Sequence, residues 1–237
     1  MKKNVIVTLL CAAALGVAGV MTSCGDKSPV SQAESLMGEA EQKVPVKVSP
    51  CLGEIPSLQL QYAEAKAMIS DQMKQRREEI KEKFKDGGSM EDAMRAYENL
   101  GDEEKLLEKE VQKVYLVRIM AEAKKLEGKA ITCEADSKQY SQATGKLVCA
   151  KDSSITSPLV FEAELTLAAP YTDYVPYCSW KYVGAGGKEL LAGAMPLKDI
   201  PSAAGKAMKA GDRFTVSFNI GVIKDRGMEL EKIVFVP

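Results

Sequence analysis

The sequence predicts an α+β protein in which an N-terminal helical hairpin precedes a small antiparallel β-barrel or sandwich. A change in hydrophobic period supports this prediction. From Leu58 to about residue 126, apolar residues recur at steps of three, four and seven, as in helices that bury one face. After Gly128 they alternate with polar residues, as in half-buried strands. An OB-like topology is one form of barrel that would fit this order.

The first residues have the pattern of an export signal. Lys2 and Lys3 precede an uncharged run over residues 5–20, which is too short for an ordinary membrane span. The residues just after this run, Met21-Thr22-Ser23-Cys24, resemble the lipobox of bacterial lipoproteins. This resemblance implies a signal peptide over residues 1–23, cleavage before Cys24 and lipid on the Cys24 thiol. A signal peptide without lipidation is the alternative.

The same resemblance implies a location and a partner. Gly25 follows the cysteine, whereas an aspartate at that position retains many lipoproteins in the inner membrane. The lipid anchor is therefore expected in the outer membrane, with the periplasmic face and the cell surface both open. Removing residues 1–23 takes two lysines from 32 basic residues and leaves 33 acidic ones, so no attraction to nucleic acid is expected.

Residues 24–57 are predicted to be a lipidated tether, because four prolines interrupt a polar segment without a sustained period. A local helix over residues 31–42 also fits. Residues 58–127 are predicted to form the hairpin, with helices over 58–85 and 90–126 and a turn at Gly87-Gly88. Gly101-Asp102 predicts a break in the second helix. Residues 106–119 are apolar on more than one side, so we expect two neighbours to cover them.

Residues 128–237 are predicted to form the antiparallel β domain. The clearest strands cover residues 161–167 and 214–222, where apolar and polar residues alternate. Weaker strands are expected over residues 130–135, 146–150, 176–183, 190–197 and 228–236. Residues 200–209 are expected to form one short helix over a barrel end.

Four cysteines remain after removal of Cys11 and lipidation of Cys24. In an oxidising compartment this even number favours two disulfides. We favour Cys133 with Cys149, on consecutive expected strands, which leaves Cys51 with Cys178. Buried free thiols are the alternative. No metal site is expected, because no two of these cysteines have the close spacing of a zinc site and no histidine is present.

The absence of histidine excludes catalytic arrangements that use one, such as Ser-His-Asp and Cys-His. No cofactor motif is present, and an enzyme is therefore not favoured. Glu162 and Glu164 share one strand face, but opposite the apolar residues they are expected to face water.

One aromatic cluster holds the only tryptophan and four of the eight tyrosines, namely Tyr171, Tyr174, Tyr177, Trp180 and Tyr182. Such side chains suit contacts with a glycan, a peptide or a protein, but they also fill the ends of small barrels.

The sequence therefore predicts a non-catalytic envelope lipoprotein that binds or scaffolds another envelope protein or a glycan. An envelope hydrolase that uses carboxylates or a Ser-Lys pair is the alternative.

Overall fold

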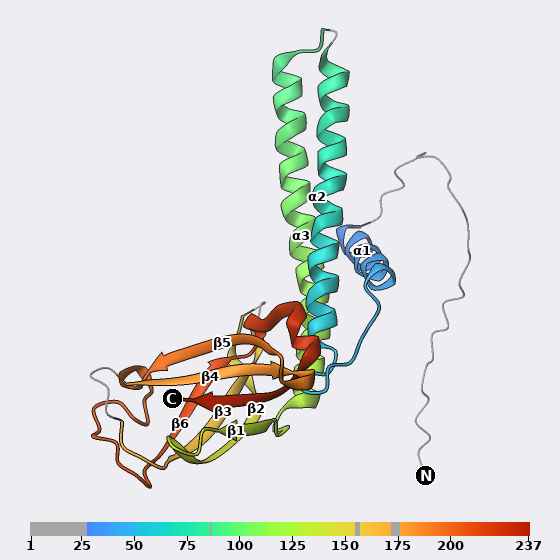
Figure 1. The fold of residues 1–237 in the computed structure, drawn as a ribbon. Helices are drawn as coiled ribbons and strands as arrows, with labels where there is room; N and C mark the ends of the chain where they lie inside the picture. Colours follow the sequence, from blue (N-terminus) through green and yellow to red (C-terminus); the bar gives the residue numbers. More distant parts are fainter. Residues whose placement is uncertain (1–27, 86, 155–156, 172–175) are drawn as a thin grey trace, which may run out of the picture.

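The computed structural model describes residues 28–85, 87–154, 157–171 and 176–237. Among these residues, three helices come first and two mainly antiparallel sheets follow them, which confirms the α+β class. Figure 1 shows the second and third helices as a long arm that projects away from the sheets. The first helix lies beside the lower part of this arm.

Helix α1 (Pro29–Lys43) occupies most of the segment expected to be a tether. The Ser28 hydroxyl accepts a hydrogen bond from the Ser31 amide (3.3 Å), and proline at the start suits a helix N-terminus. One face of α1 is fully buried against the arm through Ala33, Leu36, Met37 and Ala40. The local helix expected over residues 31–42 is therefore present, and over residues 29–43 it replaces the expected tether, because this apolar stripe gives the segment a face to bury.

Helices α2 (Ile55–Lys85) and α3 (Met90–Leu126) form the predicted hairpin. At 1.5 Å per residue they are about 46 and 55 Å long. The break expected at Gly101 is absent, because the helix is continuous between Leu100 and Leu107, both of which pack into the core. A glycine inside a helix costs only about 1 kcal/mol, which this packing offsets.

The lower part of α3 has two helical neighbours, as its sequence suggested. Both α1 and α2 contact α3, and Val111, Tyr115 and Ile119 are buried there. The cover is incomplete, since Val117 on the same helix is 73% exposed.

The strands form two separate sheets. One has the order β1-β7-β4-β5 and the other has the order β2-β3-β6. The strands are β1 (Thr132–Ala135), β2 (Tyr140–Ser154), β3 (Ser157–Leu167), β4 (Tyr177–Gly184), β5 (Glu189–Pro196), β6 (Arg213–Asn219) and β7 (Leu230–Val236). The described strands do not close into a barrel. Not all pairs are antiparallel, because β1 and β7 run parallel, with Cys133 beside Ile233.

Three 3₁₀ segments connect the strands, namely η1 (Ala185–Gly187), η2 (Leu197–Asp199) and η3 (Gly221–Glu229). The short helix expected over residues 200–209 is wrong. Turns follow η2 instead, and Gly205 has φ of 71°, which a helix does not tolerate. Side-chain bonding stabilises this segment, because the Ser202 hydroxyl donates to the Thr215 carbonyl (2.9 Å).

Contacts around residues 49–54 attach the arm to the β domain. The Ser49 hydroxyl donates to the Gly227 carbonyl (2.7 Å), and the Lys129 ammonium donates to the Pro50 carbonyl (2.8 Å). On α3, a Glu122 carboxylate oxygen accepts from the Glu54 amide (3.1 Å). One apolar core runs from α1 through the arm's base into both sheets, so the arm's base and the β domain pack as one unit.

Candidate interaction surface

The outer part of the arm differs from its base in burial. Between Met73 and Leu100, no described side chain is buried, although both residues at the limits are. Only Ile80, Phe84, Ala93 and Ala96 are half-buried in this stretch. Two helices alone bury only the seam between them, so the sides of the outer arm stay open to solvent.

Large apolar side chains are exposed on this outer part. Met90, Met94 and Tyr97 are 78%, 57% and 40% exposed. With Ala93 they follow the spacing of one helical stripe on α3. On α2, Ile80 and Phe84 lie on the side that faces α3, near the C-terminal end of the helix. We call these six residues the tip face.

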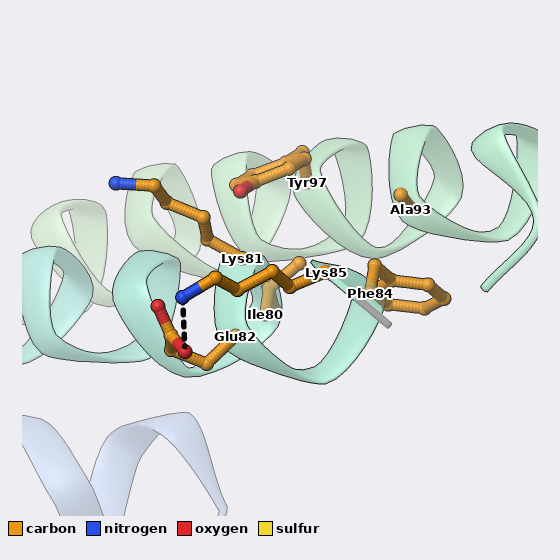
Figure 2. A pocket seen from close by; sticks show the side chains of 7 residues that line it. All are labelled: Ile80, Lys81, Glu82, Phe84, Lys85, Ala93 and Tyr97. Carbon is orange, nitrogen blue, oxygen red and sulfur yellow. Dashed lines mark hydrogen bonds and ion pairs between the residues drawn. The ribbon is translucent and has the colours of Figure 1, made fainter. Parts of the chain in front are cut away.

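The tip face contains an open hollow of about 410 Å³. Figure 2 shows its lining, with Ile80 and Phe84 from α2, and Ala93 and Tyr97 from α3. Lys81, Glu82 and Lys85 also line the hollow, and Lys85 and Glu82 form an ion pair of 3.5 Å there. An open hollow that combines apolar side chains with a few exposed charged groups is typical of a protein contact rather than of an enclosed catalytic cleft.

The hairpin turn determines the shape of the arm's end. Gly87 has φ of 117°, a conformation that other residues rarely adopt. A Cβ atom on Gly88 would lie 2.2 Å from the Phe84 ring, so the turn packs directly on this aromatic. The Lys83 ammonium lies 5.9 Å from the centre of the same ring.

Three residues of the predicted aromatic cluster pack into the fold. The Trp180 ring stacks on Phe218 of the other sheet, with ring centres 3.9 Å apart. Tyr182 meets the same phenylalanine edge-on, and Gly193 on β5 leaves room for the indole. The Tyr171 hydroxyl is 2.7 Å from that of buried Tyr140. Burial raises the pKa of Tyr171, as it does for Tyr182, to about 12.

The remaining two residues of this cluster differ. Tyr177 is 45% exposed, and Tyr174 lies outside the described residues. The Trp180 indole nitrogen is buried and has no hydrogen-bond partner in the described part of the chain. The cluster therefore favours the packing alternative, since Tyr177 is the only exposed one among its described members.

Neither predicted disulfide is present, since the four described cysteines are free thiols. Residues 128–131 do pair antiparallel with residues 145–147, with Ala130 opposite Lys146. This register places Cys149 near Glu127 instead of Cys133, and from Thr132 onward β1 pairs with β7. The Cys51 thiol donates to the Glu231 carbonyl (3.3 Å) on β7. Burial first, and then nearby Cys51, raises the pKa of Cys133 to about 11.

The other two thiols have different neighbours. Cys178 is fully buried beside Tyr140, and burial raises its pKa to about 12. The pKa of Cys149 is raised by burial and by the Glu127 carboxylate. Spatial neighbours of the cysteines thus differ from those expected from chain order.

The two glutamates considered for catalysis face solvent. Glu162 lies 3.8 Å from the Lys146 ammonium and Glu164 lies 3.7 Å from the Arg213 guanidinium, all at the surface. The shallow hollow around them is lined by these carboxylates and small polar residues. An exposed, ion-paired carboxylate lacks the enclosed setting that prepares an acid or base for catalysis.

Two further searches concern only the described residues. They contain no group of three acidic or cysteine side chains arranged to hold a metal ion. None of their helices combines the length and the apolar composition needed to cross a bilayer. The lipobox and Cys24 lie outside the described residues.

Comparison of the chain with protein-family models, with curated proteins and with solved structures finds no match.

The tip face is a site that sequence reasoning missed. Ile80 and Phe84 were expected on the buried face of the first hairpin helix, and no contact role was predicted for Met90, Met94 or Tyr97. The sequence signal that could have revealed it is the helical spacing of Met90, Ala93, Met94 and Tyr97. These residues lie between the start of α3 and Leu100, its first buried residue.

Proposed function

We propose that this chain is an envelope lipoprotein, held in the outer membrane by lipid on Cys24, whose arm is a non-catalytic binding module. One observation carries the proposed binding role, namely the exposed tip face at the end of an arm that is fixed at its base. Soluble proteins rarely leave neighbouring large apolar side chains exposed unless a partner covers them. Another protein of the envelope is therefore the expected partner, and a glycan is less suited to this apolar surface.

The β domain is proposed to be the support of this module, as an open sandwich rather than a barrel. Stacking of Trp180 on Phe218 joins the two sheets, and Phe161 lies 5.3 Å from the same ring. Side chains of two sheets that interdigitate in this way are typical of a sandwich. Such a packed domain can hold the arm in a fixed direction.

The anchor is tested with Cys24→Ser in the full chain. We expect loss of labelling by radioactive palmitate and release of the protein from the membrane fraction. Retention of both in the variant would refute the lipid anchor. The matched control is Cys51→Ser, which removes a thiol but leaves the lipobox unchanged.

The binding role is tested with Met94→Ser and Tyr97→Ser in one chain. We expect the variant to fold, by circular dichroism, but to lose the proteins that crosslink to the wild type in cells. Val117→Ser is the matched control, because Val117 is as exposed on the same helix but lies outside the tip face. If the variant keeps every crosslinked partner, the tip face is not the contact.

A further inference from the structure

The outer arm carries charges in two rows that border the tip face. On α2, Lys74, Lys81 and Lys85 are spaced by seven and four residues and form a mainly basic row, which also contains Glu78 between the first two lysines. On α3, Glu91, Glu98 and Asp102 have the same spacing and form a mainly acidic row, which also contains Arg95 between the two glutamates. All eight side chains are exposed.

Both rows flank the same face. Lys81 and Lys85, with Glu82, line the hollow that also contains Tyr97 (Figure 2). Glu98 follows Tyr97 directly and lies one helical turn after Met94. The tip face therefore has a mainly basic border on one helix and a mainly acidic border on the other.

The two rows also extend over similar heights of the arm. The Tyr97 hydroxyl donates to the Arg77 carbonyl (3.4 Å), which places residues 77 and 97 at one height. In an antiparallel hairpin, Lys74 is then level with residue 100, between Glu98 and Asp102. By the same register, Lys85 lies near the height of Glu91.

We propose that the tip face binds the tip face of a second copy of this chain, with a two-fold axis along the arm. This proposal rests on the proposed function, because it names the partner of the same surface. Rotation about such an axis keeps each residue at its height and places α2 of one copy against α3 of the other. The basic row of each copy then faces the acidic row of its partner, and the apolar stripes meet between them.

This arrangement is self-complementary, as a two-fold interface requires. Opposite charges that flank an apolar seam are also what selects partners in helical bundles. In the single chain, several of these groups already make ion pairs within their own helix. On α2 these are Lys81 with Glu78 and Lys85 with Glu82, at 3.2 and 3.5 Å, and on α3 they are Glu91 with Arg95 and Asp102 with Lys105, at 2.5 and 3.3 Å. All four pairs are exposed and contribute little to stability, so their loss would oppose association only weakly. Lys74 and Glu98 make no ion pair with any described residue.

The test uses two differently tagged full-length copies that are expressed together and purified in mild detergent. Wild-type copies should co-purify. Lys81→Glu with Lys85→Glu makes both rows acidic, and Glu91→Lys with Glu98→Lys makes both rows basic. Each double variant should associate with itself at least about tenfold more weakly than the wild type, because like charges then face each other.

Co-expression of the two double variants with each other should restore association, since an acidic row again faces a basic row on both sides. This rescue distinguishes the proposal from unfolding of the arm. The control variant, Lys138→Glu with Lys198→Glu, changes the same charge on the β domain and should associate like the wild type. Absence of rescue between folded variants would overturn the proposal.

A photo-crosslinking amino acid in place of Met94 separates this proposal from the proposed function. A crosslinked species of twice the 25.7 kDa chain, less any signal peptide, supports the second copy. Crosslinks only to another protein overturn the second copy but keep the binding role. Crosslinks only to lipid, or none, overturn both.

Discussion

The base and the outer part of the arm are built from the same two helices, yet they differ in what covers them. At the base, α1 packs on both helices, and Ala65, Ile69 and Val111 are completely buried. Ion pairs join the three helices there, between Arg118 and Glu41 (3.2 Å) and between Lys43 and Glu64 (2.8 Å). Further out, among the described elements, α2 and α3 pack only against each other.

This difference assigns stability of the fold to the base of the arm and contact with a partner to its outer part. Burial at the base stabilises the fold, because each fully buried apolar side chain contributes about 1.5–3 kcal/mol. In the outer arm, pairs such as Arg76 with Glu103 and Arg77 with Glu104 hold the helices together instead. Exposed ion pairs of this kind contribute little each. Substitutions should therefore affect stability at the base and association at the tip.

The largest expected effect tests this separation with one tyrosine from each region. Tyr115 is buried and stacks on Tyr62 at 4.3 Å, so Tyr115→Ala should lower the free energy of unfolding by about 3–5 kcal/mol. Tyr97→Ala should lower it by less than about 1 kcal/mol. Urea denaturation measures both. Equal losses in the two variants would contradict the separation.

A smaller effect is expected from two glycines near the base. Gly53 has φ of 56°, and a Cβ there would lie 2.4 Å from a Glu122 oxygen. Gly53→Ala should therefore destabilise by about 1–3 kcal/mol. Gly38, in α1, has no atom near such a Cβ, so Gly38→Ala should stabilise by about 0.5–1 kcal/mol. Thermal unfolding of both proteins would show whether the signs are opposite.

The smallest effect concerns pH. Glu122 is 7% exposed, and burial alone would raise its pKa. Hydrogen bonds from Lys125 and from the Glu54 amide outweigh burial and hold the pKa below its ordinary 4.5. Its ionised form therefore stabilises the fold above pH 4.5, and this stability is lost as pH falls through the lowered pKa.

Glu122→Gln should remove that pH dependence. The wild type should exceed the variant in urea midpoint at pH 7, and the difference should shrink as pH falls below 4.5. A difference that is constant from pH 7 to pH 3 would show that the charge of Glu122 is not responsible. Glu54→Gln, which keeps the backbone amide, is the matched control.

The helices and most strands could be predicted because their periods reflect which face is buried. The alternation from Phe161 to Leu167 is repeated in the buried face of β3. The parallel pairing of β1 with β7 could not be predicted, since it joins residues about 100 positions apart and depends on tertiary packing. Gly101 was misread because a local glycine penalty is smaller than the packing of a long helix.

For the candidate surface, composition left two alternatives open. The aromatic cluster near Trp180 suited either contact or packing, and stacking on Phe218, which buries that ring between the sheets, favours packing. The cysteine pairs were inferred from strand order, and the order in the sheets is different. The exposure of Met94 could not be derived from sequence, because it depends on how far α1 extends along the arm.

The position of β7 has a consequence for synthesis of the chain. Strand β7 lies inside its sheet, between β1 and β4, so the four-stranded sheet lacks an inner strand until residues 230–236 have been synthesised. The arm, by contrast, consists of contacts that are closer in sequence and can form earlier. A chain that ends after Met228 should keep its helical circular-dichroism signal but lose protease resistance in residues 130–228. Quality-control proteases should recognise such a truncated chain through the same exposed sheet.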